Sequence, residues 1–392
     1  SVVWLMPMPV PAVACSISRS DRVFYRVDGP DGVDAALMRL MALAGLVADI
    51  FRFGLQGGFD PDDAPAVAER LLAARRLFKE REMSGDQDVV EPFDEAHYNE
   101  QATIGQNLLF GVAIGQTFAP QNLAQNRLVS QLLEDTGLDK PLIALGRGIA
   151  ETMVEIFRGL PADHPFFAQY SFIAAADLPH YETLLARLEA GQPPTPDQRA
   201  KLLGLAFAYS EARHRLGLLD QPMRAQLLAA RHLFHQRLPQ HERAKIAFYD
   251  ADQYNEAASV EDNILFGRVV YGAPNAQARI EAILAGVIEE LGLKGDIARI
   301  GLGFACGAAG KRLTPSQRQR VALARALAKD PDLLVVNGAL AVLDPHAQAE
   351  IMKRVLAARA GRGVVWTLAP GQDGAAFEAL VTFEGGRLAG GA

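Results

Sequence analysis

The sequence predicts an α/β protein in which a large helical insertion, duplicated within itself, interrupts a small parallel sheet. Short apolar runs alternate with helical segments near both ends of the chain, which is typical of parallel sheets. Amphipathic helical pattern fills the middle, and blocks of it recur. We therefore divide the chain into residues 1–55, a strand and helix of the core; residues 56–260, the insertion; and residues 261–392, the rest of the core.

Four apolar runs are expected to form the sheet. Residues 2–5 (VVWL) are rich in β-branched and aromatic side chains, and the prolines after them do not continue a strand. Similar runs lie at 333–336, 363–368 and 380–383. Because the chain begins inside what reads as a core strand, we expect it to be part of a longer polypeptide.

Two blocks of the middle region recur at one spacing. LLAARRLF at 71–78 returns as LLAARHLF at 227–234, and FDEAHYNEQATIGQNLLFG at 93–111 returns as YDADQYNEAASVEDNILFG at 249–267. Both pairs lie 156 residues apart (227 − 71 and 249 − 93). A constant offset indicates that an ancestral helical segment was duplicated within one domain.

A shorter element occurs three times, as GLVADIFRFG at 45–54, GLDKPLIALG at 137–146 and GLKGDIARIG at 292–301. Each copy begins with Gly-Leu and carries a second glycine nine residues after the first. Since each copy follows a helical pattern, we expect its first glycine to terminate that helix.

Composition excludes several classes of protein. The net charge of −7 and the pI near 5.7 argue against a nucleic-acid binder, which usually carries a basic patch. Two distant cysteines, Cys15 and Cys306, are too few for a disulfide framework or a cysteine-built zinc site, so a reducing compartment is expected. No segment reaches the roughly 18 uninterrupted apolar residues of a membrane-spanning helix.

The strongest local signal begins at Thr314. Thr314 is an N-cap, Pro315 occupies the first helical position and Gln317 the third, which together form a capping box for a helix over 315–329. This chemistry explains the residues structurally. The functional alternative is that the Thr314 and Ser316 hydroxyls hold a phosphate at the helix N-terminus.

The stretch LTPSQRQRVALARALAKDPDLLVVNGALAVLDP (313–345) resembles the signature motif, Walker B strand and D-loop of ABC transporter ATP-binding domains. Those domains typically read L-S-G-G-Q-R-Q-R, then a helix rich in A-L-A-R-A-L, then a strand that ends in D-E. VEDNILFG (260–267) resembles the family segment after the Q-loop. Residues 361–370 resemble the H-loop strand, and 381–388 the closing strand. The resemblance implies part of a P-loop NTPase fold of the ABC type.

The chain departs from the family pattern at the positions that bind phosphate and metal and that activate water. It contains no G-x-x-x-x-G-K-[ST] phosphate loop. Asn337 replaces the Walker B aspartate, Gly338 the glutamate that activates water, and Ala369 the H-loop histidine. Pro7 and Met8 stand where the Q-loop glutamine is expected. We therefore assign no catalytic residue and expect no ATP hydrolysis by the chain alone.

The resemblance still implies nucleotide-binding positions. They are Thr314, Pro315, Ser316, Gln317 and Asp344, which would act on ATP held by a second ABC ATP-binding domain, with Mg²⁺ bound only through that competent partner. Pro315 lacks an N–H and so removes one phosphate donor. A membrane-spanning transporter domain or subunit is the other implied partner, at the cytoplasmic face of the plasma membrane. The alternative is a non-enzymatic scaffold built on an ABC frame.

Two smaller features could indicate either a ligand site or a purely structural role. His232 and His235 could suggest a metal, but the matching residues of the other copy are basic, which favours a solvated cationic face and no metal site. Tyr-Asn-Glu recurs at 98–100 and 254–256, and we interpret it as a repeated turn before a helix, because asparagine favours turns.

Overall fold

The computed structural model describes residues 2–5, 29–85, 87–161, 163–165, 167, 172–368, 372, 374–384 and 387–389. The chain divides into two compact units: unit 1 is Ser1–Gly57 with Gly295–Ala392, and unit 2 is Gly58–Lys294. Strand and helix segments after residue 260 pack with the helices of unit 2.

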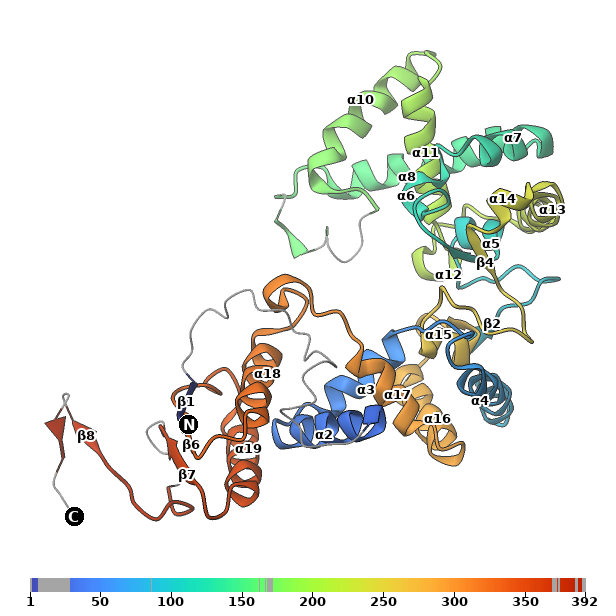
Figure 1. The fold of residues 1–392 in the computed structure, drawn as a ribbon. Helices are drawn as coiled ribbons and strands as arrows, with labels where there is room; N and C mark the ends of the chain where they lie inside the picture. The colour runs from blue at the N-terminus through green and yellow to red at the C-terminus, as the bar shows by residue number, and fades with distance from the viewer. Residues whose placement is uncertain are drawn as a thin grey trace. The chain divides into compact units, whose positions relative to one another are not determined.

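Unit 1 is an α/β unit whose sheet and helices are drawn in Figure 1. Its strands are β1 (Val2–Leu5), β6 (Leu333–Val336), β7 (Gly363–Trp366), β8 (Phe383–Glu384) and β9 (Arg387–Leu388). Its helices are α2 (Gly29–Leu43), α3 (Val47–Gln56), α17 (Lys294–Leu302), the 3-10 turn η2 (Ala308–Gly310), α18 (Pro315–Ala328) and α19 (Pro345–Ala358).

The main sheet has three parallel strands in the order β1-β6-β7, which confirms three of the four predicted strands. Val2 pairs with Leu333, and Leu333 pairs with Gly363. The prediction that 380–383 joins this sheet is wrong. Phe383 instead pairs antiparallel with Leu388 in the separate β8–β9 ribbon.

The core of unit 1 lies between β6 and its helices. Leu334 and Val336 of β6 are buried together with Leu323 and Leu327 of α18. Spacing of three or four residues places the buried side chains of α18 on one face of that helix. Helix α18, whose first turn carries the candidate site, is thereby packed into the same core as β6.

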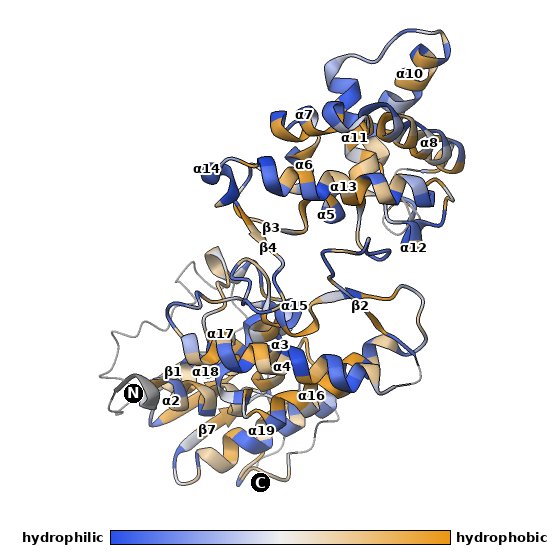
Figure 2. Ribbon diagram, turned by 90° about the vertical axis from the view of Figure 1, so that its right-hand side faces the viewer, coloured by the Kyte–Doolittle hydropathy of each residue, from blue (hydrophilic) through white to orange (hydrophobic). Residues whose placement is uncertain are grey.

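Unit 2 is built mainly from helices. They are α4 (Pro65–Met83), α5 (Ile104–Leu109), α6 (Pro120–Leu123), α7 (Arg127–Thr136), α8 (Asp139–Phe157), the 3-10 turn η1 (Ala175–Asp177), α10 (Leu178–Glu189), α11 (Pro196–Ala208), α12 (Glu211–His214), α13 (Gln221–Arg237), α14 (Gln240–Arg243), α15 (Val260–Leu265) and α16 (Ala276–Glu290). Figure 2 shows hydrophobic residues along α8 and α11, which pack against each other.

Four short strands of unit 2 pair across the two copies of the repeat. They are β2 (Val90–Pro92), β3 (Gly111–Ala113), β4 (Ile246–Phe248) and β5 (Gly267–Val269). β2 pairs antiparallel with β5, and β3 pairs antiparallel with β4. Since β4 and β5 lie 156 residues after β2 and β3, each copy supplies one strand to each ribbon.

The three Gly-Leu elements share a helix contact that their second glycine makes possible. In unit 1, a Cβ built on Gly54 would lie 2.0 Å from the Ile297 carbonyl oxygen, and one on Gly301 would lie 1.9 Å from the Ile50 carbonyl oxygen. The backbones of α3 and α17 therefore touch where only glycine fits. The first glycines of the elements have positive φ angles of 74°, 70° and 63°, as expected for residues that terminate helices.

The element at 137–146 makes the same kind of contact inside unit 2. A Cβ on Gly146 of α8 would lie 2.0 Å from the Leu202 carbonyl oxygen of α11.

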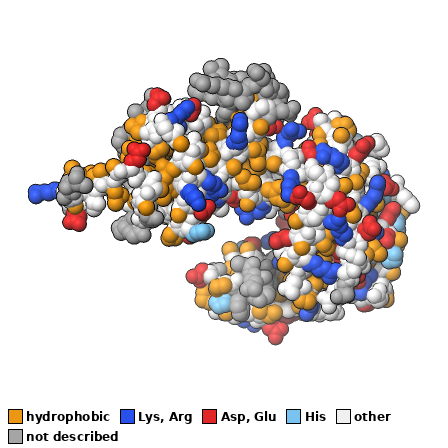
Figure 3. All heavy atoms as spheres, turned by 90° about the horizontal axis from the view of Figure 1, so that it is seen from below, with side chains coloured by type: hydrophobic (Ala, Val, Ile, Leu, Met, Phe, Trp, Pro, Cys, Tyr) orange, Lys and Arg blue, Asp and Glu red, His pale blue; other side chains and the backbone are white. Residues whose placement is uncertain are grey.

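Among the helices that the structure describes, none is long and apolar enough to cross a lipid bilayer. Acidic and basic side chains are interspersed on the face of the molecule that Figure 3 presents.

Candidate functional site

The predicted capping box at the start of α18 is present. The Thr314 Oγ1 accepts a hydrogen bond from the Gln317 backbone N–H at 3.2 Å, and the Gln317 Oε1 accepts one from the Thr314 N–H at 2.9 Å. Thr314 and Pro315 are exposed and Ser316 is partly exposed, whereas Gln317 is buried. The hydroxyl-bearing turn therefore faces solvent, while Gln317 points into unit 1.

A buried carboxylate on α3 fixes the first turns of α18. Asp49, which is 7% exposed, accepts a hydrogen bond from the Gln317 Nε2 at 2.8 Å. Its other oxygen lies 2.9 Å from the Arg320 guanidinium, which also donates to the Gly45 carbonyl at 2.7 Å. Gln317 and Arg320 thus tie the signature-like helix to α3. Sequence reasoning missed Asp49, because its partners lie far along the chain.

Replacing Asp49 with alanine is expected to lower the free energy of unfolding of unit 1 by about 3 kcal/mol, because the partly buried Arg320 charge and the buried Gln317 amide lose their shared partner. Asp344→Ala, which removes an exposed N-cap, should cost about 1 kcal/mol. Both tryptophans, Trp4 and Trp366, belong to unit 1, so urea unfolding followed by tryptophan fluorescence measures this unit. Equal losses in the two variants would contradict the role of Asp49.

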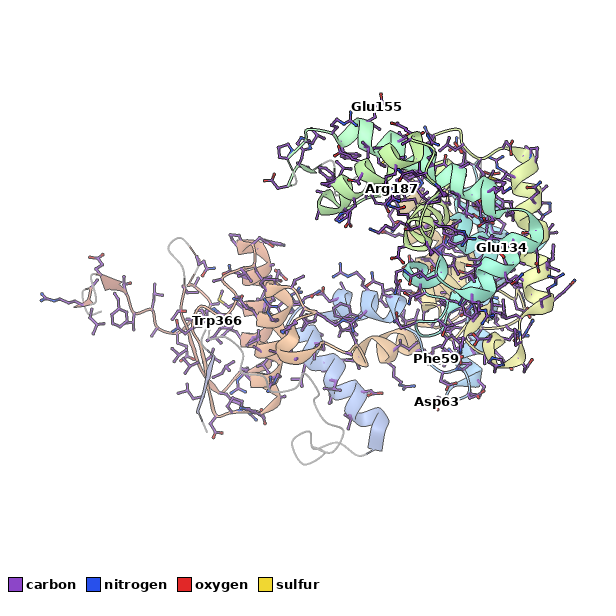
Figure 4. All side chains as sticks on the ribbon, turned by 90° about the horizontal axis from the view of Figure 1, so that it is seen from above. Phe59, Asp63, Glu134, Glu155, Arg187 and Trp366 are labelled. Atoms are coloured by element: carbon purple, nitrogen blue, oxygen red, sulfur yellow. The ribbon has the colours of Figure 1, made fainter. Side chains whose placement is uncertain are left out.

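The turn after β6 carries Asn337 and Gly338, the two positions at which the ABC ATP-binding domains that the sequence resembles have acidic residues. Gly338 has a φ of 60°, and its N–H donates to the Thr367 Oγ1 at 2.9 Å. The same hydroxyl lies 3.2 Å from the Asn337 Oδ1 and 3.5 Å from the Val336 carbonyl oxygen. Thr367 directly follows Trp366, which Figure 4 labels on β7. One hydroxyl therefore joins the ends of β6 and β7.

Asp344 is exposed and caps α19, since its Oδ1 accepts a hydrogen bond from the Ala347 N–H at 2.9 Å. Asp344, which belongs to the stretch that resembles the D-loop of ABC ATP-binding domains, therefore has a structural role in the chain alone. Ala369, Pro7 and Met8 lie outside the described residues. Within those described residues, no group of three or more acidic, histidine or cysteine side chains is arranged to hold a metal ion.

Unit 2 contains a set of buried arginine contacts that was not predicted from the sequence. Arg75 of α4 is almost fully buried and donates from Nε to the Asn263 carbonyl at 2.8 Å and from NH2 to the Asn263 Oδ1 at 3.1 Å. Its NH1 donates to the carbonyls of Asp250, Ala251 and Gln253. The guanidinium also lies over the Phe266 ring, 4.2 Å from its centroid.

Arg231 of α13 makes the same set of contacts with the other copy. It donates to the Asn107 carbonyl at 2.7 Å and to the Asn107 Oδ1 at 2.8 Å, and lies over the Phe110 ring at 4.6 Å. Its NH1 donates to three carbonyls in the turn at 94–97. Each arginine thus enters a cradle formed by the opposite copy. Burial lowers the pKa of both guanidinium groups to about 10.

The recurring Tyr-Asn-Glu segments form the turns that complete these cradles, as interpreted from the sequence. The Asn99 Oδ1 accepts hydrogen bonds from the N–H groups of Gln101 and Ala102, just before α5. Asn255 repeats this with the Ala257 N–H before α15. His235, by contrast, is not part of a solvated face. It is partly buried, its Nε2 lies 3.0 Å from the Leu109 carbonyl oxygen, and burial lowers its pKa.

The start of α11 repeats the start of α18. Thr195-Pro196-Asp197-Gln198 forms the same capping box, with the Gln198 Oε1 accepting from the Thr195 N–H at 3.0 Å. The five residues TPDQR at 195–199 match TPSQR at 314–318 except at one position, a signal that the sequence alone contains. Asp197 places an acid where α18 has Ser316, so α11 is a matched reference with an unfavourable charge for anions.

The chain is similar in part to proteins whose names describe them as ATP-binding proteins. It is 31% identical over 146 residues to the heterocyst differentiation ATP-binding protein HepA of a Nostoc species, a match that covers 37% of this chain and 23% of that protein. It is 34% identical over 127 residues to the energy-coupling factor transporter ATP-binding protein EcfA1 of Symbiobacterium thermophilum, covering 32% and 40%. It is 37% identical over 101 residues to the methionine import ATP-binding protein MetN 2 of Staphylococcus epidermidis, covering 26% of each.

The chain spans less than half the length of each of these curated relatives. No family model matches it. No solved structure matches it either. The sequence matches support an ABC-type ATPase domain over part of the chain.

Proposed function

We propose that the chain is a degenerate ATP-binding component of an ABC transporter, which presents α18 to a nucleotide held by a partner domain and does not hydrolyse ATP alone. The observation that carries this proposal is the contrast between two neighbouring parts of unit 1. The frame of α18 is capped and anchored through Asp49. The turn after β6 offers an amide and a glycine, tied to Thr367, where hydrolysis needs carboxylates.

The chemistry of that turn supports the loss of hydrolysis. Asn337 is a neutral ligand, and Mg²⁺ prefers anionic oxygen. Gly338 has no side chain to accept a proton from water. Asp344, the next acid along the chain after that turn, uses one oxygen to cap α19. The hydroxyls of the exposed Thr314 and the partly exposed Ser316 remain on the outer side of α18, where a partner's phosphates could approach the helix N-terminus.

The proposal includes the remaining components of such a system. A second ABC ATP-binding domain would supply the phosphate loop, Mg²⁺ and general base, and a membrane-spanning domain or subunit would tether the pair at the cytoplasmic face of the plasma membrane. We also propose that unit 2 arose by duplication of one helical segment. The matched contacts of Arg75 and Arg231, and the matched strand ribbons, support that origin.

The purified chain is expected to show no Mg²⁺-dependent ATPase activity above background, because the described site has no metal carboxylate and no base. With a hydrolysis-deficient ABC ATP-binding domain as the probe, ATP should promote association, measured by analytical ultracentrifugation. Thr314→Ala should weaken that association, while the matched Thr195→Ala should not. Robust turnover by the chain alone that disappears in Asn337→Ala would overturn the proposal.

A non-enzymatic scaffold is the second candidate function. The observation in its favour is that unit 2, the larger compact unit, is stabilised by contacts between its own residues that do not involve a nucleotide. Calorimetric titration with ATP separates the two candidates. A heat of ATP binding by the mixture that exceeds the heat given by the probe domain alone supports the first, and equal heats with and without this chain support the scaffold.

A further inference from the structure

Asn337 differs from the other asparagines of the chain in the residue that follows it in the sequence. Of the eight asparagines in the sequence, only Asn337 precedes a glycine. In an Asn-Gly pair, the backbone nitrogen of the glycine can attack the asparagine side-chain carbonyl, because no Cβ obstructs the approach and the two groups are already joined covalently. Asn337 and Gly338 are both partly exposed, so water can reach the pair.

Thr367 contacts both reacting groups of this pair. Its Oγ1 accepts a hydrogen bond from the Gly338 N–H at 2.9 Å, and the same oxygen lies 3.2 Å from the Asn337 Oδ1, to which its proton can be donated. The Val336 carbonyl is a more distant acceptor at 3.5 Å, so the amide oxygen is favoured. A hydroxyl that donates to the amide oxygen withdraws electrons from Cγ and stabilises the negative charge that develops on Oδ1 during attack.

From this arrangement we propose that Asn337 is a self-modification site, at which the folded chain converts an amide into a carboxylate. The Gly338 nitrogen loses its proton to solvent and forms a bond to the Asn337 Cγ. The side-chain nitrogen takes up one proton from solvent, its bond to Cγ breaks, and it leaves as ammonia. The resulting five-membered imide then takes up one water molecule. Opening of one C–N bond gives aspartate, and opening of the other gives isoaspartate. Neither step changes an oxidation state.

The product places a negative charge at the end of β6, beside Thr367. When the ring opens to aspartate, residue 337 gains the anionic oxygen ligand that Mg²⁺ prefers. The modification itself does not depend on the proposed function. Only its consequence for metal binding rests on that function, so the two are measured separately.

The test is a time course with the full-length chain at neutral pH and physiological temperature. Trypsin releases residues 330–353, which contain Asn337 as the single asparagine, and residues 269–279, which contain the exposed Asn275 followed by alanine. Mass spectrometry measures the fraction of each peptide in which the amide has become an acid. We expect Asn337 to convert at least about tenfold faster than Asn275. Calorimetric titration of Asn337→Asp with Mg²⁺ alone then measures the consequence for metal binding.

Two variants test the role of Thr367. Thr367→Val, which removes the hydroxyl, should slow conversion about fivefold, and Thr367→Ser, which retains it, should restore the rate. A synthetic peptide of residues 330–353 gives the rate without the fold. The proposal is overturned if Asn337 keeps its amide in the folded chain while the peptide converts. Equal rates in the valine and serine variants would overturn the part assigned to Thr367.

Discussion

Replacement of Gly146 by alanine is expected to lower the free energy of unfolding of unit 2 by about 3 kcal/mol or more. The added Cβ would lie 2.0 Å from the Leu202 carbonyl oxygen and 2.7 Å from the carbonyl carbon. Both atoms belong to the backbone of α11, so the clash cannot be relieved by rotating a side chain. The helices must move apart, and the buried contacts between α8 and α11 loosen with them.

Gly204 provides the matched control for this substitution. It lies inside α11, and a Cβ built on it would meet nothing within 4 Å. Gly204→Ala is therefore expected to leave stability unchanged or raise it by up to about 1 kcal/mol, because alanine favours helix. Urea unfolding followed by far-UV circular dichroism compares the two variants. If Gly146→Ala is as stable as Gly204→Ala, the close approach of these helices is not present in solution.

Arg75→Met is expected to cost unit 2 about 3–5 kcal/mol. Methionine fills similar volume, but the substitution leaves the carbonyls of Asp250, Ala251, Gln253 and Asn263 without the donor that they share. The Phe266 ring also loses its cation. Since Arg231 makes the corresponding contacts with the other copy, Arg231→Met should have a similar cost.

Arg76 is the control for Arg75, because it comes next on the same helix and is exposed. Its nearest acidic partner, Asp252, lies 3.8 Å away, and such surface pairs contribute about 0–1 kcal/mol. Arg76→Met should therefore unfold at nearly the urea concentration of the unmodified chain. A cost for Arg75→Met that does not exceed that of Arg76→Met would show that the cradle contributes little to stability.

Local signals in the sequence predicted local structure well. The predicted runs at 2–5, 333–336 and 363–368 contain the three strands of the main sheet, and the Thr-Pro-x-Gln pattern forms the capping box of α18. The first glycine of each Gly-Leu element terminates a helix. Each of these features depends on residues within about one turn or one strand of each other, which is the range at which propensity and periodicity act.

The features that sequence reasoning missed depend on contacts between distant segments. Asp49 bonds to Gln317 across 268 positions of the chain, and nothing in the neighbourhood of either residue marks the pair. The 156-residue offset revealed that two segments are alike, but not that each inserts its arginine into the other. For the same reason, the pairing of β5 with β2 and the packing of α15 and α16 against α4 were not predicted from the sequence.

The exchanged cradles have a consequence for the order in which the chain can fold during synthesis. Arg75 leaves the ribosome long before Asn263, its partner 188 positions later, has been translated. Strand β2 likewise waits for β5. The first copy therefore emerges with an arginine, a strand edge and an apolar helix face that have no native partner, which is the kind of intermediate that chaperones bind. A nascent chain released before residue 260 should remain protease-sensitive at α4 and β2, whose partners α15 and β5 have not been translated.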